Sequence, residues 1–436
     1  MPYSKEQIGA LVRPDSVNKS IYTDPELFKL EMQRIYGRIW VYVGHDSQVP
    51  NVGDYHATMI GDQDVVMVRA DDGKVHVLYN RCPHKGAMVV PEGNGCAGKF
   101  FRCPYHGWTF RLNGHHLAAP MKLGLEGTRF DPASPEFSMR ELARVDSYRG
   151  FVFASQAADG IPLPEFLGGA RSSLDNFCDR APEGEVVASK NVFRVIQRAN
   201  WKVFYENLND TMHARVTHES AIQAARDEVK AEGLEQMPLR LHIMENNGQP
   251  YEFWEKLKLV AFDHGHSYME GIFDPGSIKK DPISHAHYQT LIDAYGEKRA
   301  LEILSENRHN TIIYGSGSPH TVFQQFRIIR PLSVDRTLIE IQVFRLKGAP
   351  EEVYRRALMY CNVINSPASA VMPDDLEVYF RCQMGNRTRG GEWVSQHRYA
   401  GTDKPIDGGL VAINGTSELP MRNQFNAWKQ YMLAAA

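Results

Sequence analysis

The chain has 436 residues and a formal net charge of −3, with 43% hydrophobic and 23% charged residues. This composition can build ordinary hydrophobic cores, which excludes global disorder, and the length predicts two or three domains. The small net charge argues against nucleic acid or an anionic membrane as the main partner. No stretch approaches about 20 apolar residues and the N-terminus lacks a signal-peptide pattern, so we expect a cytoplasmic protein without a membrane span.

The first part of the chain predicts a helix followed by a β-rich region. Residues 20–37 (SIYTDPELFKLEMQRIYG) are expected to be helical, with Asp24 as the cap and Pro25 in the first turn. Residues 38–158 alternate short β-branched runs with turns, as in the hairpin signal VVMVRADDGKVHVLYN. The Gly- and Pro-containing stretch QAADGIPLPEF then predicts a connection.

The remainder, residues 159–436, mixes strands with helices. NVFRVIQ (191–197) predicts a strand and WKVFYENLNDTMH (201–213) a helix, and HTVFQQFRIIRP and TLIEIQVFRL predict paired strands within 320–346. Further helices are expected in EEVYRRALMYCNVI, DDLEVYFRCQM and MRNQFNAWKQYML. The predicted fold class is therefore α+β: a small all-β domain and a larger domain of antiparallel sheet and helices, on which a helical segment at 1–37 packs.

Two Cys–His pairs lie in the predicted β-domain. RCPHKG places Cys82 and His84 two residues apart, CPYHGW places Cys103 and His106 three apart, and eighteen residues separate the pairs. The prolines and glycines of both segments predict turns that could meet at one end of the domain. Two thiolates and two imidazoles suit tetrahedral zinc or a Rieske [2Fe–2S] cluster. One Cys and one His in each loop favours the cluster, over zinc and over a catalytic Cys–His pair.

A second set of chemically capable residues lies in ENLNDTMHARVTHES. His213 and His218 are five residues apart, so the second must come from a distorted or ending helix. Asp210 precedes His213 by three residues and could fix the tautomer of an imidazole. An iron site of the facial type also needs a carboxylate ligand. Asp374 and Asp375 begin a predicted helix, where on their own they are better explained by capping and the helix dipole.

Together these motifs resemble the large, catalytic subunit of Rieske non-haem iron aromatic-ring-hydroxylating oxygenases. The resemblance runs from IYTDPELFKLEMQRIYGRIWVYVG to GTSELPMRNQFNAWKQYM, nearly the whole chain. It implies a [2Fe–2S] cluster in a Rieske domain at 38–158, and a catalytic domain of the helix-grip, START-like type at 159–436. The cluster ligands implied by the resemblance are Cys82, His84, Cys103 and His106.

The resemblance also implies a second metal centre. His213, His218 and Asp375 match the ligands of a mononuclear Fe(II), and Asp375 is chosen over Asp374 because the second aspartate of the family's pair is the usual ligand. Asp210 matches the aspartate that carries electrons between centres across a subunit boundary, by contacting the cluster's second histidine, here His106, of a neighbouring copy.

Two details depart from the most familiar branch of the family. Lys85 stands where the first loop often has arginine, and the stretch from Asn207 to His213 is one residue shorter than in the naphthalene-dioxygenase type. The second departure argues against transferring pocket residues from that branch. The chain is more similar to the benzoate, terephthalate and salicylate branches, whose substrates are aromatic carboxylates.

The activity implied is that of a terminal oxygenase that uses O2 to hydroxylate an aromatic acid, as a dioxygenase or a monohydroxylase. The one GxGxxG string, GNGCAG at 93–98, lies in the predicted β-rich region and does not open a helix, so the chain has no dinucleotide-binding fingerprint. It also has no plant-type ferredoxin cysteine run, so electrons must come from a separate NAD(P)H-dependent reductase, with or without a ferredoxin. We expect a trimer, or an α3β3 hexamer with a small β subunit. The alternatives are O- or N-demethylation by the same metals, and an electron-transfer protein without oxygenase chemistry.

A cation in the predicted late strands could bind the acid. Arg327 and Arg330 lie on opposite faces of HTVFQQFRIIRP by strand alternation. Arg327 is the residue we expect to hold the substrate carboxylate in a bidentate pair, the alternative being a solvated strand arginine.

Overall fold

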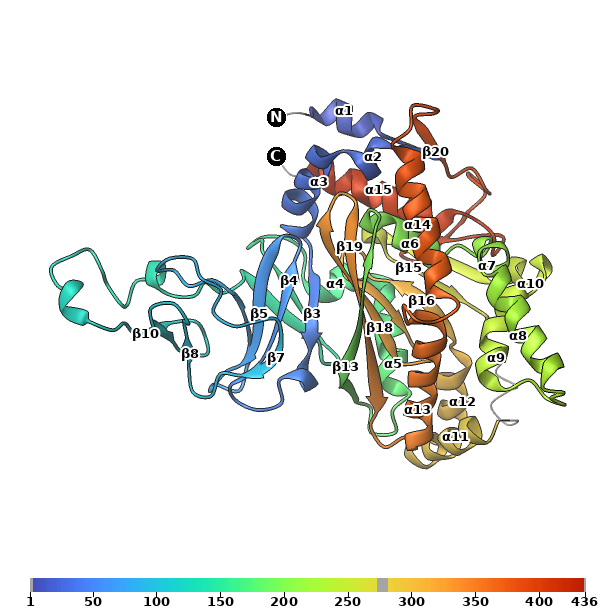
Figure 1. Ribbon diagram of the computed structural model, residues 1–436, viewed down its shortest axis with the longest axis horizontal. Coiled ribbons are helices and arrows are strands. Elements are labelled where there is room, and N and C mark those ends of the chain that lie inside the picture. The colour runs from blue at the N-terminus through green and yellow to red at the C-terminus, as the bar shows by residue number, and fades with distance from the viewer. Residues whose placement is uncertain (1–2, 273–280, 435–436) are drawn as a thin grey trace. The chain divides into compact units, whose positions relative to one another are not determined.

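The computed structural model describes residues 3–272 and 281–434, which form two compact units. The larger unit combines Met1–Ile35 with Pro164–Ala436, and the smaller unit is Tyr36–Leu163. The smaller unit is therefore a continuous insertion in the chain of the larger one (Figure 1). Within the described part of the chain, no helix combines the length and the apolar character that crossing a membrane requires.

The smaller unit is built from short antiparallel strands in three sheets, ordered β6–β5–β4–β7, β11–β12–β3 and β10–β9–β8. The predicted hairpin is confirmed, because β5 pairs with β6 and Gly73 takes a positive φ in the turn between them. The strands are β3 (Val41–His45), β4 (Asp54–Ile60), β5 (Gln63–Arg69), β6 (Val75–Tyr79), β7 (Gly93–Cys96), β8 (Phe101–Arg102), β9 (Thr109–Phe110), β10 (His116–Ala118), β11 (Arg144–Tyr148) and β12 (Phe151–Ser155).

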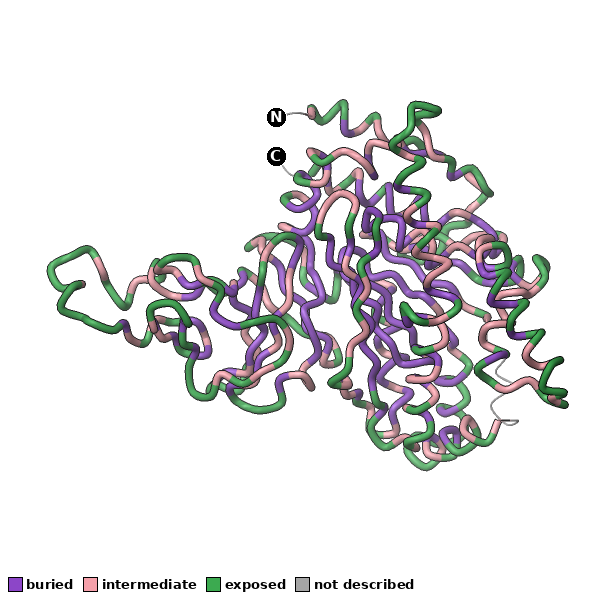
Figure 2. The backbone as a smooth tube through the Cα atoms, in the orientation of Figure 1, coloured by how far each residue is buried: buried purple, intermediate pink, exposed green. Residues whose placement is uncertain are grey.

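Short 3-10 helices lie between these strands, at Asp46–Gln48, Lys122–Gly124 and Pro135–Phe137. The segment around the second and third of these turns is largely exposed, as its green trace shows in Figure 2. Two apolar side chains there, Met121 and Leu123, face solvent almost completely.

The larger unit contains a long antiparallel sheet. Its two parts are ordered β13–β19–β18–β17 and β16–β15–β14–β22–β21, and a bridge between Ile313 and Gly317 links β16 to β17. The strands are β13 (Val186–Gln197), β14 (Lys258–Phe262), β15 (Ser267–Glu270), β16 (Arg308–Ile312), β17 (Gly317–His320), β18 (Gln325–Ser333), β19 (Arg336–Leu346), β21 (Lys404–Ile406) and β22 (Gly409–Val411). A small separate sheet contains β1 (Val12–Arg13), β2 (Ser16–Asn18) and β20 (Trp393–Ser395).

Helices flank this sheet, whose central strands are buried along most of their length (Figure 2). They are α1 (Lys5–Ala10), α2 (Ser20–Thr23), α3 (Pro25–Glu31), α4 (Leu163–Leu167), α5 (Arg171–Asp179), α6 (Trp201–Leu208), α7 (His213–Thr217), α8 (Glu219–Ala231), α9 (Leu239–Glu245), α10 (Tyr251–Glu255), α11 (Pro282–Tyr295), α12 (Glu297–Ser305), α13 (Glu351–Tyr360), α14 (Met372–Asn386) and α15 (Leu419–Ala434). Helices α3 and α13 each continue into one π-helical turn, at Met32–Tyr36 and Cys361–Asn365.

Two predicted helices differ from the observed ones. The segment 20–37 is broken at Asp24, whose carboxylate accepts a hydrogen bond from Glu26 N at 2.8 Å and caps α3. The helix predicted over 201–213 ends at Leu208, because Asp210 Oδ1 accepts a hydrogen bond from Met212 N at 2.7 Å and closes a turn. Asp and Asn side chains favour such local turns over a continued helix.

A buried carboxylate ties three helices of the larger unit together. Glu31 at the end of α3 accepts hydrogen bonds from Lys202 Nζ at 2.6 Å, Trp201 Nε1 at 2.8 Å and Trp428 Nε1 at 2.7 Å. All four side chains are almost completely buried. The N-terminal segment thereby fixes α6, which precedes the first histidine motif, and α15 at the other end of the chain.

Candidate metal centres and cavity

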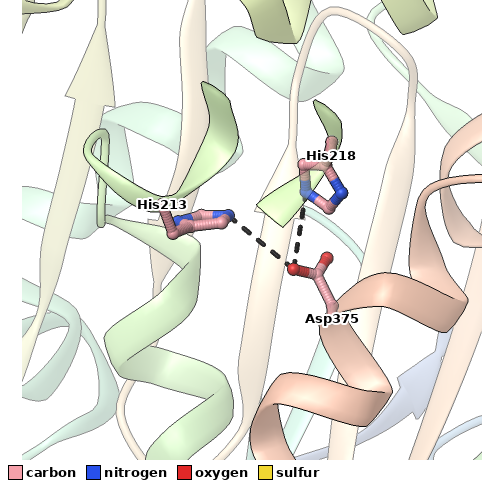
Figure 3. Close-up of side chains that lie close together, drawn as sticks. All are labelled: His213, His218 and Asp375. Atoms are coloured by element: carbon pink, nitrogen blue, oxygen red, sulfur yellow. Dashed lines mark ion pairs between the residues drawn. The ribbon is translucent and has the colours of Figure 1, made fainter. Parts of the chain in front are cut away.

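Three side chains of the larger unit converge at the start of α14 (Figure 3). His213 is the first residue of α7, His218 lies between α7 and α8, and Asp375 lies in the first turn of α14. Asp375 Oδ1 is 3.7 Å from His213 Nε2 and 3.5 Å from His218 Nε2. The ligand atoms of all three lie within 4.8 Å of one another.

The five-residue spacing of the histidines follows from the local fold. Helix α7 contains only five residues and ends at Thr217, and His218 leaves the helical conformation at φ −98° and ψ 22°. The ring of His218 can then turn back toward that of His213, and the two ring centroids are 5.6 Å apart. The ending helix that the spacing predicts is therefore present.

The geometry of these three groups fits a metal ion. Two ligand atoms in adjacent positions, each about 2.1 Å from one ion, are about 3 Å apart. The two imidazole nitrogens, at 3.7 and 3.5 Å from Asp375 Oδ1, would therefore move only slightly toward this oxygen to bind one ion. Each histidine turns its other nitrogen to an outer carboxylate: His213 Nδ1 is 3.7 Å from Asp210 Oδ2, and His218 Nδ1 is 3.5 Å from Asp374 Oδ2. Carboxylates in this outer position orient metal-ligating imidazoles.

The electrostatics of the two histidines differ. Burial lowers the pKa of His213, but the neighbouring Asp210 and Asp375 together outweigh burial and raise that pKa above its ordinary value. For His218 burial dominates, and its pKa is lowered in spite of the nearby carboxylates. A neutral imidazole is the form that binds a metal ion.

The two aspartates of α14 have different surroundings. Asp375 Oδ1 accepts a hydrogen bond from Asn207 Nδ2 at 3.1 Å and faces both histidines, whereas Asp374 lies behind His218. The capping explanation is wrong for both, because the first helical residue is Met372 and the helix has no side-chain cap. Asn207, which the sequence alone did not single out, fixes the orientation of the Asp375 carboxylate.

The two Cys–His loops of the smaller unit are built alike. Cys82 O accepts a hydrogen bond from Gly86 N at 3.0 Å, and Cys103 O accepts one from Gly107 N at 3.1 Å. Both glycines take a positive φ, 78° and 68°, which a side chain would disfavour in each turn. Each loop therefore folds back so that its cysteine is buried, while its histidine lies two or three residues further on, nearer the surface.

The arrangement of these four side chains fits a two-iron cluster better than a single zinc ion. Burial and the adjacent Cys103 thiol raise the pKa of Cys82, and the rings of His84 and His106 are 4.7 Å apart. Among the described residues the four do not bring three ligand atoms within 4.8 Å of one another, as a tetrahedral zinc with bonds of about 2.0–2.3 Å requires. A thiolate end and an imidazole end match the two irons of a Rieske cluster.

A cavity of about 580 Å³ opens beside the His213–His218–Asp375 group, and these three residues line it together with Arg327 and Asn310. Arg327 comes from β18 and is buried, so it is not the solvated strand arginine considered above. Its Nη2 donates to Asn310 Oδ1 and to Ser318 Oγ, while its Nε has no hydrogen-bond partner. Burial also lowers the pKa of this guanidinium.

Arg330, three residues along β18, does not line this cavity; its Nε lies 3.6 Å from Glu340 Oε2. The opposite faces predicted for the two arginines are consistent with these surroundings. Asn310 is a further residue that sequence reasoning missed, because a single polar residue in a strand carries no recognisable pattern.

Comparison with known proteins decides what this pair of centres belongs to. Residues 39–127 match the Rieske [2Fe-2S] domain, and residues 179–435 match the catalytic domain of the ring-hydroxylating alpha subunit. The chain belongs to the ring-hydroxylating alpha subunit family. It is an oxidoreductase of the Rieske oxygenase type, and its two domains imply a Rieske cluster and a mononuclear iron. An electron-transfer protein without oxygenase chemistry is thereby excluded.

Individual relatives of this ring-hydroxylating alpha subunit cover almost its full length. It is 30% identical to toluate 1,2-dioxygenase subunit alpha of Pseudomonas putida over 99% of this chain and 95% of that protein. It is 29% identical to the anthranilate 1,2-dioxygenase large subunit of Acinetobacter baylyi over 96% and 89%. The solved structure of naphthalene 1,2-dioxygenase with indole bound in the active site matches with a TM-score of 0.80 at 23% identity, over 96% of this chain and 92% of that chain. The predicted α+β fold class is confirmed.

Proposed function

We propose that this chain is the terminal oxygenase of a multicomponent system that hydroxylates an aromatic carboxylate. The observation that carries the proposal is Arg327, a buried guanidinium that lines the same cavity as His213, His218 and Asp375. Its hydrogen-bond partners Asn310 and Ser318 are both neutral. A buried cation whose hydrogen-bond partners are neutral strongly favours an anionic ligand. Toluate, 2-halobenzoate and anthranilate, named in relatives of this chain, are all benzoic acids.

In this proposal each side chain has a defined task. His213, His218 and Asp375 would hold the iron, which with two imidazoles and one carboxylate keeps open positions for O2. Asn207 holds the Asp375 carboxylate by its hydrogen bond at 3.1 Å. Arg327 would bind the carboxylate of the substrate and so orient its ring in the cavity.

The smaller unit would supply electrons one at a time. Cys82, Cys103, His84 and His106 would hold the cluster, with its imidazole end toward the surface, where His106 is exposed. Asp210, beside His213 Nδ1, would accept a hydrogen bond from His106 of a neighbouring copy and connect the two centres. This role requires an oligomer, a trimer or an α3β3 hexamer with a small β subunit. A separate reductase, with or without a ferredoxin, would deliver electrons from NAD(P)H.

The first test is the content of iron and acid-labile sulfide in anaerobically purified protein. We expect about three iron and two sulfide per chain, the sum of a Rieske cluster and one mononuclear iron. Asp375→Asn should lower the iron to about two and leave the sulfide unchanged, whereas the matched Asp374→Asn variant should retain all three. Zinc without sulfide would overturn the assignment of both centres.

The second test concerns the substrate. Arg327→Ala should weaken binding of an aromatic acid by about tenfold to a hundredfold, the value of a charge-assisted hydrogen bond, and leave binding of the corresponding amide nearly unchanged. Equal effects on acid and amide would discard the role of Arg327. Product analysis with labelled O2 then separates ring hydroxylation from O- or N-demethylation.

A further inference from the structure

Strand β16 contains a bulge at the wall of the cavity. Its neighbour β15 pairs Met269 with His309 and Ser267 with Ile312, so that two residues of β16, Asn310 and Thr311, lie opposite one residue of β15. Asn310 takes the left-handed conformation with φ 52°. Asparagine is one of the few residues with a side chain that tolerates this conformation, and bulges next to active sites re-aim side chains.

The bulge directs the Asn310 side chain between two structural elements. Its Oδ1 accepts a hydrogen bond from Arg327 Nη2, and its Nδ2 donates one to the carbonyl oxygen of Leu208. Asn310 is itself buried, with only 7% of its surface exposed. Both ends of the short Asn310 amide are therefore hydrogen-bonded. A displacement of the Arg327 guanidinium would move this amide, and the amide would in turn move the Leu208 carbonyl.

Leu208 is the last residue of α6, and the chain leaves the helix there for the turn that carries Asp210. Asp210 Oδ1 closes this turn on Met212 N, and His213 begins α7 immediately afterwards. The carbonyl that Asn310 holds is thus two residues from the proposed electron-transfer aspartate and five from a proposed iron ligand.

We propose that Asn310 is a positioning residue that couples binding of the substrate carboxylate at Arg327 to the turn carrying Asp210. The inference rests on the proposed function, in which Arg327 is the carboxylate anchor. An acid that binds the Arg327 guanidinium fixes this group, the Asn310 amide and the end of α6 in one arrangement. A neutral analogue leaves the guanidinium without that anchor, so the turn is held less well even when the ring occupies the same cavity.

Two variants of Asn310 separate the parts of this linkage. Asn310→Gly removes both hydrogen bonds and is compatible with the left-handed backbone. Asn310→Asp has the same shape and still accepts from Arg327, but it places an oxygen against the Leu208 carbonyl and supplies Arg327 with an anion that competes with the substrate. The measurements are calorimetric binding of an aromatic acid and of its amide, and the product formed per NADH consumed with each, in the holoenzyme with its reductase.

For Asn310→Asp we expect affinity for the acid to fall at least about tenfold and affinity for the amide to change less than about twofold. For Asn310→Gly we expect the product formed per NADH with the acid to fall to the value that the unmodified enzyme shows with the amide. The value for the amide itself should not change. Iron and sulfide contents, measured in parallel, should stay at three and two, as in the unmodified enzyme.

The outcomes distinguish this inference from the function on which it rests. If Arg327→Ala leaves the preference for acid over amide intact, the carboxylate anchor is wrong and the role of Asn310 falls with it. If Arg327→Ala abolishes the preference but both Asn310 variants behave like the unmodified enzyme, the coupling is wrong and the anchor stands. A purely structural role would lower the values for acid and amide by the same factor, and that result also overturns the coupling. Should Asn310→Asp fail to fold, the glycine variant alone decides.

Discussion

Replacing Glu31 by glutamine should destabilise the larger unit by about 3–5 kcal/mol, the usual cost of removing one partner from a buried ion pair. Glu31 accepts three hydrogen bonds at 2.6–2.8 Å, from the ammonium of Lys202 and from the indoles of Trp201 and Trp428. Glutamine keeps the shape but provides one oxygen and one amide nitrogen. Its amide nitrogen is a hydrogen-bond donor, and it would face the donors of Lys202, Trp201 and Trp428. Glutamine is also neutral, so it removes the negative charge that pairs with the Lys202 ammonium.

The magnitude can be assembled from these contacts. Loss of the charge-assisted bond from Lys202 accounts for roughly 1.5–3 kcal/mol, and one buried donor left without an acceptor for roughly 1–3 kcal/mol. Their sum agrees with the value expected for a broken buried pair. At about 2–4 °C for each kcal/mol, the melting temperature should fall by on the order of 10 °C.

Unfolding in urea, followed by tryptophan fluorescence, measures this change directly, since Trp201 and Trp428 both contact Glu31. The double variant Glu31→Gln/Lys202→Met is the control. Because it also removes the uncompensated charge, it should be more stable than Glu31→Gln alone. A Glu31→Gln protein within about 1 kcal/mol of the unmodified one, or a double variant that loses the sum of the two single losses, would refute the reasoning.

Further predictions concern other parts of the larger unit. Asp210→Asn preserves the acceptor of the turn and should keep both metal centres while abolishing coupled turnover, as shown by metal content and product yield. At Gly317 a Cβ atom would lie 2.1 Å from the carbonyl oxygen of Arg327, so Gly317→Ala should cost at least about 1–3 kcal/mol and weaken acid binding in calorimetry. Burial lowers the pKa of His266 to about 3 and of His287 to about 4. Both stay neutral in the folded state, so the stability that they contribute is present above the unfolded-state pKa of about 6.5 and is lost as the pH falls. Together they should lower the free energy of unfolding in urea by about 4 kcal/mol between pH 7 and pH 5.

These predictions have specific controls. Gly401→Ala introduces the same kind of backbone strain where no atom lies within 4 Å, and it should leave acid binding unchanged. Coupled turnover preserved in Asp210→Asn would remove the proposed electron path. Stability that is constant between pH 7 and pH 5 would show that His266 and His287 are not held neutral in the folded protein.

The local chemistry of the chain could be predicted from its sequence, and the long-range contacts could not. The two Cys–His loops, the hairpin before them and the ending helix at His218 follow from turn residues and spacing over short stretches. The turn at Asp210 was missed, since the apolar stripe of α6 continues as a helical pattern past Leu208. A side-chain hydrogen bond to Met212 N nevertheless ends the helix. Such competition between a side chain and the backbone is not visible in periodicity.

The residues that line the cavity could be predicted only in part, because their surroundings depend on strands that pair in the folded sheet. Arg327 could be singled out as a strand cation, but its burial and its unused Nε depend on β16 and β17, which lie beside it only in the folded sheet. Asn310 depends on a bulge, whose position is set by pairing with β15 rather than by the sequence of β16 alone. Ligand assignments, the carboxylate anchor and the oligomer therefore stay predictions for the experiments above.

The insertion of residues 36–163 between the two parts of the larger unit sets an order of events during synthesis. The smaller unit is complete in the nascent chain soon after residue 163, and it can bury its own core at once. Glu31 must wait for Trp428, which follows it by 397 residues. At about 5–20 residues per second this interval is roughly 20–80 s, during which α3 has a carboxylate without its final partners. A ribosome that stops early in α15 would release a chain in which the smaller unit can be folded. The larger unit would then lack the hydrogen bond from Trp428 to Glu31.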